Sequence, residues 1–569
     1  MKQFPQSSKV IVVLFFAVSL VFSLVCLSSA NAGEKLYNGI VLPDEWPPRI
    51  EQLTFEPMPV PYLDSPPAVI NIDVGRQLFV DDFLIEQTTL KRTFHKVEPY
   101  SENPVVRPDK TWEYCGDPTQ RERGYIGPYA MVFSDGVWYD PADKLYKMWY
   151  MGGLLNSTCY AVSKDGFNWE KPALDVQPGT NIVHQGNRDS STVWLDLEEK
   201  DPNRRYKMCR YHFTPDIGLV LHFSADGIHW SQPLAIAPYT KDRSTIFYNP
   251  FRNVWVYSLR ENVDPIAGQN PPKLFGRARC YLECKDLLSG AGWKQGEPTF
   301  WVGCDRLDPL RPGDPNFLPQ LYNLDAVAYE SVLLGLFSII RANPTPERPK
   351  INEIFAGFSR DGFHWYRPFR EPIIGVSEHK GAWNWGNVQS AGGCCLVVGD
   401  RLFFYFSGRA GQGRLGKHKS FQDADGSTGL GFLRRDGFAS MNTDGNEGQL
   451  TTRPVMFSGK YLFVNVDADK SELQVEVLDE QGKVIEPFCR DNCLPVIADK
   501  TIQPIMWKKA KDLSGLAGKP VRFRFHLTGG CLYSFWVSPD KSGASFGYVA
   551  AGGPGFTGSR DTVGSAAYK

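Results

Sequence analysis

The chain has 569 residues, of which 42% are hydrophobic and 22% charged, a balance typical of globular proteins. Its length allows one large domain and one smaller domain. The formal net charge of −1 at pH 7 excludes a strongly basic surface, so we expect neither a nucleic-acid partner nor an anionic-membrane partner.

Residues 1–32 are predicted to be an export signal. Lys2 and Lys9 precede an apolar run over 10–27, and Ala30-Asn31-Ala32 offers the small residues of a cleavage site. A membrane anchor is the alternative interpretation, because the apolar run is fairly long. No later segment is apolar over enough residues to span a bilayer. We therefore expect a secreted or periplasmic protein without membrane contact after cleavage.

A seven-residue phrase, Ser-x-Asp-Gly-x-x-Trp, is repeated along the chain. Clear copies are Ser163–Trp169, Ser224–Trp230 and Ser359–Trp365, and degenerate copies lie at Cys280–Trp293 and Leu433–Phe438. The spacing defines five units of roughly 60–75 residues, which indicates a repeat architecture. The Asp-Gly step predicts a tight turn with a positive φ at Gly, and the Trp is predicted to pack between neighbouring sheets. The phrase is therefore assigned to the scaffold.

Short runs rich in aromatic and β-branched residues precede each copy, and they predict three or four antiparallel strands per unit. Five such units predict an all-β fold with a five-bladed β-propeller over residues 76–445. Residues 33–75 are Pro-rich and are predicted to form an extended strap on the surface. Residues 90–106 are expected to supply the outer strand of the last blade and so close the ring.

From about residue 450 the repeat stops and alternating hydrophobic residues replace it. Runs such as Tyr461–Val466 and Val521–His526 predict strands at short spacing, which favours a β-sandwich over residues 450–550. The Gly-rich tail over 551–569 is expected to be flexible.

The innermost strands of a propeller line a central channel, so the residues just before each first strand are candidate site residues. Aligning the units places Asp189 level with Asp242, and places Asp135 and Asp325 two residues further along the same strand face. Clustered carboxylates are costly unless they bind a cation or perform acid–base chemistry, as glycosidic-bond cleavage requires. Capping of a local turn by each Asp is the alternative.

These carboxylates receive provisional roles in such a reaction. Asp135 is the candidate base or nucleophile, while Asp189 and Asp242 would orient the sugar and tune pKa values. Glu261 is the preferred general acid, and Glu378 is the second choice.

Arginines recur where second strands end, and we expect them to line the same funnel and bind hydroxyls, carboxylates or sulfates of a sugar. Surface ion pairing is the alternative. Trp383 and Trp385 are candidates for stacking on a sugar ring, and core packing is the alternative for both. The predicted substrate-binding residues are Asp325, Arg260, Arg341, Arg409, Trp385 and Gln389.

This chemistry requires no cofactor, but a Ca²⁺ ion among the channel carboxylates would also explain their clustering. The paired Cys or His spacing of a zinc site is absent, so we predict no metal ligands. An odd number of cysteines remains once Cys26 leaves with the export signal, which argues against a fully paired disulfide framework. Cys489 and Cys493 flank a loop that a disulfide could bridge.

The units, the phrase and the trailing sandwich together resemble the five-bladed glycoside hydrolases of families 32 and 43: invertases and fructosidases, levansucrases and arabinanases. Arg188-Asp189-Ser190 is similar to the Arg-Asp-Pro motif of the fructosidases, whose Asp stabilises the transition state. The resemblance covers about residues 76–550. It implies a glycosidase with a carboxylate acid/base pair in the propeller funnel.

Two motifs of these enzymes differ here. The nucleophile motif Trp-x-Asn-Asp-Pro-Asn-Gly is absent, and Asp135 only occupies a comparable blade. Glu283-Cys284 looks like the acid motif, but it falls on the third strand of its unit, so the acid role is not carried over to Glu283.

Three functions fit the sequence. The first is an exported glycoside hydrolase that acts on a polysaccharide or its oligosaccharides. The second is a carbohydrate-binding propeller without catalysis. The third is a sialidase, whose Asp-boxes resemble the phrase, but that fold needs six blades and the five units weigh against it.

Overall fold

The computed structural model describes residues 33–50, 53–114, 128–186, 188–214, 217–263, 276–311, 317–343, 348, 350–410 and 425–568. The predicted export signal lies outside this range. Over the described ranges, no helix combines the length and the apolar character needed to cross a membrane. The protein is nearly all-β, and the helices of the described ranges are short turns. These are α1 (Pro61–Asp64), α3 (Leu287–Gly290), η1 (Thr111–Tyr114), η2 (Pro202–Arg204), η3 (Arg490–Asn492), η4 (Ser514–Leu516) and η5 (Gly564–Tyr568).

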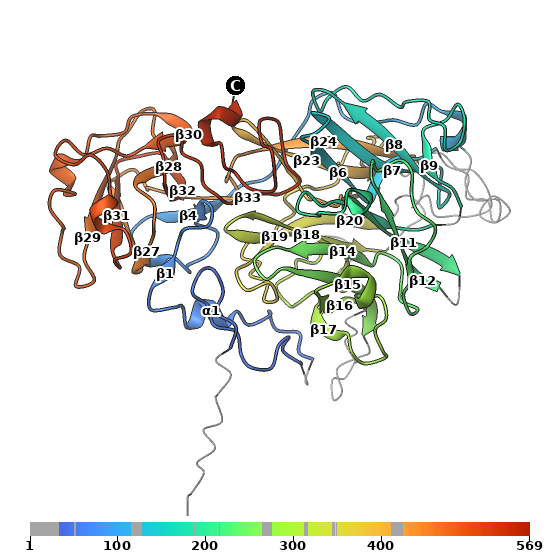
Figure 1. Cartoon of the computed structure of the whole chain (residues 1–569), viewed down its shortest axis with the longest axis horizontal. Coiled ribbons are helices and arrows are strands. Elements are labelled where there is room, and N and C mark those ends of the chain that lie inside the picture. The colour runs from blue at the N-terminus through green and yellow to red at the C-terminus, as the bar shows by residue number, and fades with distance from the viewer. Residues whose placement is uncertain are drawn as a thin grey trace, which may run out of the picture.

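Five antiparallel sheets follow one another along the chain, one for each repeat unit (Figure 1). The first has the order β6 (Ala130–Asp140), β7 (Leu145–Gly152), β8 (Ser157–Ser163), β9 (Ile182–His184). The second has the order β10 (Ser191–Leu195), β11 (Tyr206–Thr214), β12 (Ile217–Ser224), β13 (Ala235–Ile236). The third has the order β14 (Thr245–Asn249), β15 (Val254–Val263), β16 (Gly276–Cys284), β17 (Thr299–Val302).

The last two sheets borrow strands from distant parts of the chain. The fourth has the order β20 (Ile351–Ser359), β19 (Val332–Ala342), β18 (Gln320–Glu330), β33 (Tyr548–Val549). The fifth has the order β21 (Asn387–Ser390), β23 (Arg401–Arg409), β24 (Gly426–Arg434), β5 (Glu98–Pro99), with β22 (Leu396–Val398) also beside β23. The pairing of β5 with β24 confirms that the segment before residue 106 supplies the outer strand of the fifth unit.

The sheets pack face to face through strands that are buried on both sides. Every residue of β6 and β19 is buried, so these strands have no polar, solvent-facing side. The first strands β6, β10, β14 and β18 contact one another in this order, and β21 contacts both β20 and β6. The positions just before and within these first strands therefore come together.

The repeated phrase forms the same turn in its three clear copies. In each, the Ser hydroxyl accepts a hydrogen bond from the Gly N–H at 2.9–3.0 Å. The Asp carboxylate accepts from the two N–H groups after the Gly. Gly166 and Gly227 have φ +80° and Gly362 has φ +91°, values that favour glycine. The predicted tight turn is confirmed.

Each of these turns is also bonded to the sheet that precedes its own, and for the first sheet that neighbour is the fifth. A backbone carbonyl of the turn accepts a hydrogen bond from a buried aromatic side chain of that sheet. The donor and acceptor pairs are Tyr405 Oη to Gly166 O (2.6 Å), Trp149 Nε1 to Gly227 O (2.7 Å) and Trp301 Nε1 to Phe363 O (2.7 Å). The phrase thus joins neighbouring sheets, as its assignment to the scaffold requires.

A second pair of sheets, drawn on the left in Figure 1, has its own core that includes Phe523, Phe525 and Phe535. One sheet has the order β30 (Asp499–Pro504), β28 (Tyr461–Asp467), β32 (Cys531–Ser538), β25 (Ala439–Asn442), β4 (Lys91–Phe94), with β2 (Gln77–Leu78) also beside β32. The other has the order β29 (Leu473–Leu478), β31 (Arg522–Leu527), β26 (Gly448–Thr452), β3 (Ile85–Thr88). A parallel pair, β1 (Ile70–Asn71) with β27 (Val455–Met456), lies beside them.

Two predicted boundaries differ from the structure. Strands β2, β3 and β4, assigned from the sequence to the region 76–445, belong to the second pair of sheets, because β26, β32 and β25 need partners at their edges. The tail over 551–569, expected to be flexible, is packed over its described part. Asp561 is fully buried and its Oδ2 accepts a hydrogen bond from Arg435 at 2.9 Å.

Candidate functional site

The four predicted carboxylates lie at the first strands of four sheets, in two layers. Asp135 on β6 and Asp325 on β18 are the more buried pair, with exposed fractions of 0% and 3%. Asp189 and Asp242 precede β10 and β14, and 25% of the Asp242 side chain is exposed. Shared partners link the two layers, so the structure gathers these residues instead of scattering them.

Asp135 is fully occupied by neighbouring side chains. Arg188 donates to it in bidentate fashion, from Nη1 to Oδ1 at 2.7 Å and from Nη2 to Oδ2 at 2.8 Å. The Ser191 hydroxyl donates to Oδ1 at 2.8 Å. Arg188 Nε also donates to the backbone carbonyl of Asp189 at 2.7 Å. Asp135 therefore holds Arg188, and Arg188 in turn holds the backbone of Asp189.

Asp325 joins three units through its carboxylate. Its Oδ2 accepts hydrogen bonds from Ser390 Oγ at 2.6 Å, Asn323 Nδ2 at 2.8 Å and Ser134 Oγ at 3.3 Å. Burial raises the pKa of Asp325, and the nearby guanidinium of Arg243 opposes that rise. The many partners suit a structural carboxylate more than one that exchanges protons with a substrate.

Asp189 and Asp242 form an interacting pair with different partners. Burial, followed by the charge of Asp242, raises the pKa of Asp189 to about 6, while the Arg243 guanidinium opposes this. Asp189 Oδ1 accepts from the Ser190 N–H at 2.8 Å. Asp242 makes an ion pair with Arg260 Nη1 at 2.7 Å. One carboxyl thus keeps its proton up to about pH 6, whereas the other has a cation beside it.

Arg243 lies between these carboxylates, and its guanidinium is fully buried. The Nε, Nη1 and Nη2 atoms have no hydrogen-bond partner in the described part of the chain. The guanidinium carbon lies 3.8 Å from the centre of the Phe133 ring and 5.6 Å from that of Tyr322. Burial lowers the pKa of Arg243.

The backbone of Arg243 is fixed although its side chain is unpaired. Its φ of +64° is rare for a residue with a side chain, and such conformations cluster at functional sites. The Arg243 N–H donates to Ser190 Oγ at 2.9 Å, and Arg279 Nη1 donates to the Arg243 carbonyl at 2.9 Å. Residues of the second and third units thus hold the backbone at Arg243 in place.

No protein-family model matches this sequence, and no curated protein matches it. Solved structures that it is similar to include a thermostable family-43 glycoside hydrolase, with 15% identity and a TM-score of 0.36 over 55% of this chain and 93% of that one. A family-43 arabinoxylan arabinofuranohydrolase from Bacillus subtilis has 9% identity and a TM-score of 0.32 over 76% and 99%.

A third such structure is described under the GH130 family of mannoside phosphorylases, which contains glycoside hydrolases that target β-1,2 mannosidic linkages in Candida mannan. It has 13% identity and a TM-score of 0.38 over 63% of this chain and 96% of that one. All three TM-scores are below 0.5, so these likenesses carry neither a fold nor an activity over to this chain.

The predicted acids lie in different surroundings. Burial raises the pKa of Glu261, which is partly exposed on β15 beside Arg260. Glu378 is exposed and makes ion pairs with Arg311 and Arg348, each at 2.6 Å. A catalytic role for either residue stays a prediction.

Glu283 makes contacts of a different kind. Its Oε2 accepts hydrogen bonds from Tyr281 Oη at 2.6 Å and from Trp46 Nε1 at 3.2 Å, and it pairs with Arg252. These partners anchor the N-terminal segment to the third sheet, which is a structural role.

The predicted substrate-binding arginines divide into two groups. Arg260 pairs with Asp242, and the Arg409 guanidinium lies 5.2 Å from the centre of the same Phe133 ring that Arg243 contacts. Arg341 pairs with Glu353 at 2.5 Å, and its other described partners are backbone carbonyls outside the site. The structure therefore brings Arg260 and Arg409 to the carboxylates but not Arg341.

The fifth unit contributes one buried and one accessible tryptophan. Trp385 is buried, and the guanidinium of Arg348 lies 5.2 Å from its ring centre, so its face is already covered. Trp383 is half-buried and lines an open groove of about 480 Å³ together with Tyr114 and Asp425. Gln389 is buried on β21, and its Oε1 has no hydrogen-bond partner in the described ranges.

Sequence reasoning missed Arg243, Arg279, Tyr322 and Phe133. Arg243 stands within the segment Asp242-Arg243-Ser244 that precedes a first strand, so position alone marked it as a candidate. Nothing in the sequence indicates that its guanidinium is unpaired, whereas Arg188 in the corresponding segment is paired.

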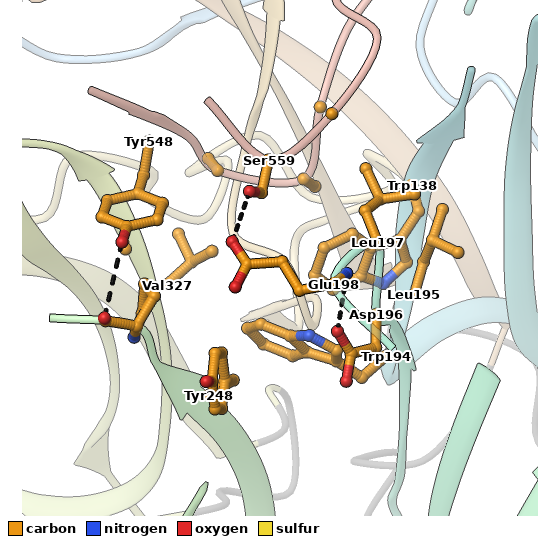
Figure 2. Close-up of a pocket in the computed structure, with 16 residues that line it drawn as sticks. Trp138, Trp194, Leu195, Asp196, Leu197, Glu198, Tyr248, Val327, Tyr548 and Ser559 are labelled. Atoms are coloured by element: carbon orange, nitrogen blue, oxygen red, sulfur yellow. Dashed lines mark hydrogen bonds between the residues drawn. The ribbon is translucent and has the colours of Figure 1, made fainter. Parts of the chain in front are cut away.

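A cavity at the other end of these strands does not share this chemistry (Figure 2). The cavity measures about 50 Å³ and lies beside Trp138 and Trp194. Trp138 follows Asp135 by three residues on β6, and Trp194 holds the matching position on β10. Ser559 and Tyr548 of the C-terminal segment cover it through hydrogen bonds to Glu198 at 2.7 Å and to the Pro250 carbonyl at 3.4 Å. We assign this cavity to packing.

In the part of the chain that the structure describes, no group of three or more His, Cys, Asp or Glu side chains is placed to hold a metal ion. The guanidinium groups of Arg243, Arg260 and Arg409 already supply positive charge beside the carboxylates, which disfavours a cation there. A Ca²⁺ ion stays a prediction. Cys489 and Cys493 are both free thiols, so the disulfide that could bridge this loop is not formed.

Proposed function

We propose that this protein is an exported glycoside hydrolase that cleaves glycosidic bonds of a poly- or oligosaccharide. We further propose that its five sheets form a five-bladed propeller with the site at the mouth of the central channel. The observation that carries the proposal is the Asp189–Asp242 pair. One carboxyl has a pKa of about 6, and the other is paired with Arg260 at 2.7 Å.

These two environments suit the two carboxyl roles in glycoside hydrolysis. A general acid must be protonated near the working pH, which a raised pKa provides. The second carboxylate must be ionised to act as a base or a nucleophile. We therefore assign the acid role to Asp189 and the base or nucleophile role to Asp242.

Asp135 and Glu261 receive revised roles within this proposal. Both oxygens of Asp135 are engaged by Arg188, so we propose that it positions Asp189 through Arg188 instead of acting as the base. Glu261, with its raised pKa, remains the alternative acid.

The groove beside Trp383 supports a carbohydrate ligand. Aromatic faces stack on the apolar face of a sugar ring, and Trp383 lies flat against the glycine backbone of β23 and β24. A Cβ atom added at Gly408 or Gly429 would approach the Trp383 ring to 2.2 or 2.3 Å. Ala410, the residue that follows Arg409 in the chain, also lines the groove.

The test is release of reducing ends from a panel of neutral and acidic polysaccharides by the purified full chain. We expect Asp189→Asn and Asp242→Asn to reduce turnover by about a hundredfold or more. Glu261→Gln should reduce it less than about threefold. A larger loss in Glu261→Gln than in Asp189→Asn would transfer the acid role to Glu261.

A carbohydrate-binding propeller without catalysis is the alternative function. It is favoured by the hydrogen bonds that hold Asp135 and Asp325 in structural roles, which leave the Asp189–Asp242 pair for chemistry. Binding of a panel member without any release of reducing ends would establish it.

A further inference from the structure

The unpaired guanidinium of Arg243 is unusual for a buried charge. Buried charged groups are normally paired, because transfer of an unpaired ion out of water is strongly unfavourable. Arg243 offers five N–H donors in a planar fork, and none of its three nitrogens has a protein partner in the described ranges. The nearest carboxylates do not fill this fork.

One oxygen of each carboxylate near Arg243 already has another partner. Asp325 Oδ2 accepts from three other side chains, and Asp242 pairs with Arg260. Asp189 Oδ1 accepts from the Ser190 backbone, and Arg243 donates no hydrogen bond to Asp189 within the described structure. The carboxylates therefore act on Arg243 through their charge and not through a hydrogen bond.

A second guanidinium lies beside the same aromatic ring as Arg243. The guanidinium groups of Arg243 and Arg409 lie 3.8 Å and 5.2 Å from the centre of one phenyl ring, that of Phe133. The Arg243 side chain is fully buried, so its guanidinium does not reach solvent in this structure.

We propose that Arg243 binds a carboxylate or sulfate group carried by the sugar, so that the substrate is an acidic poly- or oligosaccharide. A guanidinium binds the two oxygens of such a group in bidentate fashion, which a sugar hydroxyl does not offer. Asp242, next to Arg243 in the chain, is the most exposed of the four carboxylates, so an anion would have to enter from this side. This substrate class rests on the proposed function, because it places the sugar at Asp189 and Asp242.

The test compares three monosaccharides that differ in one group: glucose, glucuronate and glucose 6-sulfate, with inorganic sulfate as a fourth probe. Binding to the full chain is measured by calorimetry at constant ionic strength. We expect at least one anionic probe to bind about tenfold or more tightly than glucose. The comparison of glucuronate with glucose 6-sulfate identifies which anion the site prefers.

Matched variants assign the effect to Arg243. Arg243→Met should abolish the preference for the anionic probes, and Arg243→Lys should retain part of it because the charge remains. Arg401→Met is the control, since Arg401 is an exposed arginine on β23. A circular-dichroism melt of each variant establishes that it is folded.

Four outcomes separate this inference from the proposed glycosidase. Equal anion binding by wild type and Arg243→Met, or no Arg243-dependent binding of any anionic probe, overturns the inference. Turnover of a neutral polysaccharide that Arg243→Met leaves unchanged also overturns it, while the glycosidase stands. Arg243-dependent anion binding without turnover of any panel member supports the anion site and removes the enzyme. Anion binding that persists in Asp189→Asn supports the separation of the two roles.

Discussion

Arg188 and Arg243 are equally buried arginines in corresponding segments, but their surroundings are opposite. Arg188 makes four hydrogen bonds to side-chain and backbone oxygens, whereas Arg243 makes none from its guanidinium within the described ranges. Removal of a paired charge leaves its partner buried and unpaired, while removal of an unpaired charge leaves nothing behind. The two residues should therefore respond differently to the same substitution.

Arg188→Met should lower the free energy of unfolding by about 3–5 kcal/mol, because Asp135 would lose its bidentate partner inside the protein. Arg243→Met should leave it within about 1 kcal/mol of wild type, or raise it. Urea denaturation followed by tryptophan fluorescence measures both variants. An equal loss in the two variants would mean that Arg243 has a partner which holds the fold together.

The raised pKa of Asp189 gives the activity a defined pH limit. A general acid acts only when protonated, so kcat/KM should fall as the pH rises through about 6, the pKa of Asp189. In Asp189→Asn this fall of kcat/KM with rising pH should disappear together with most of the activity. The measurement is a pH–rate profile from pH 4 to 9 on the best substrate of the panel. If the decrease of kcat/KM above about pH 6 persists unchanged in Asp189→Asn, another group is responsible for it.

The same pKa predicts how Asp189 affects stability. Its pKa in the folded protein, about 6, is above the ordinary value of 3.8, so the folded state binds the proton more tightly than the unfolded state does. The stabilising contribution is complete below about pH 4 and is lost as the pH rises through about 6. The amide side chain of the variant would stay neutral at every pH, so Asp189→Asn should become more stable than wild type as the pH rises above about 4. The difference should reach about 2–3 kcal/mol at pH 8. Thermal melts at pH 4 and pH 8 test the sign.

At the scale of elements, the repeated turn is both a local structure and a contact between sheets. Gly227 has φ +80°, and a Cβ atom there would lie 2.5 Å from the Trp149 ring of the preceding sheet. Gly179 has nearly the same φ, +79°, but a Cβ atom added there would meet no heavy atom within 4 Å. A comparison of substitutions at Gly179 and Gly227 therefore separates the cost of backbone strain from the cost of a steric clash.

Gly179→Ala should cost about 1 kcal/mol, the effect of a positive φ alone. Gly227→Ala should cost about 2–4 kcal/mol, because overpacking against Trp149 is added to the same backbone strain. The difference between the two urea midpoints measures the contact between the first and second sheets. Equal costs would show that the turn does not couple the sheets, and neither variant should change kcat/KM under conditions where both are fully folded.

At the scale of the whole molecule, the sequence predicted the features that its repeated segments determine, namely the turns and the sheets. The three clear phrases located the turns, because Gly and Asp are required there by local geometry, and together with the two degenerate copies they located the five sheets. Strands β2, β3 and β4 were misplaced, since segments of two to four residues carry no periodicity that assigns them to a sheet. Arg243 was missed for a related reason: the lack of a partner is a property of the folded surroundings, not of the residue type.

The buried tail explains why composition misled at the C-terminus. Small residues after Gly552 suggested disorder, but they let the chain pass close to its neighbours, and Asp561 reaches a buried ion cluster. Arg435 Nη2 contacts Asp561 at 2.9 Å and Glu330 at 3.1 Å, and Arg76 contacts Asp436 at 3.1 Å. This cluster lies where the fourth and fifth sheets meet the sandwich and the C-terminal segment, which Figure 1 shows running between them.

Asp561→Ala should therefore lower the free energy of unfolding by about 2–4 kcal/mol and make the C-terminal segment sensitive to protease, because Arg435 would lose one of the two ion partners, Asp561 and Glu330, that it has in the described ranges. Thr562→Ala is the matched control, since Thr562 is exposed one residue away and its loss should stay within about 0.5 kcal/mol. Urea midpoints and the rate of limited proteolysis measure both variants.

The pKa of Asp561 is lowered, against the effect of burial, by Arg435 and Arg76, so its contribution to stability is present at neutral pH and is lost only as the pH falls below about 4. The stabilities of wild type and Asp561→Ala should accordingly converge in acid, and a difference that stays constant from pH 7 to pH 3 would mean that packing, not charge, holds the tail.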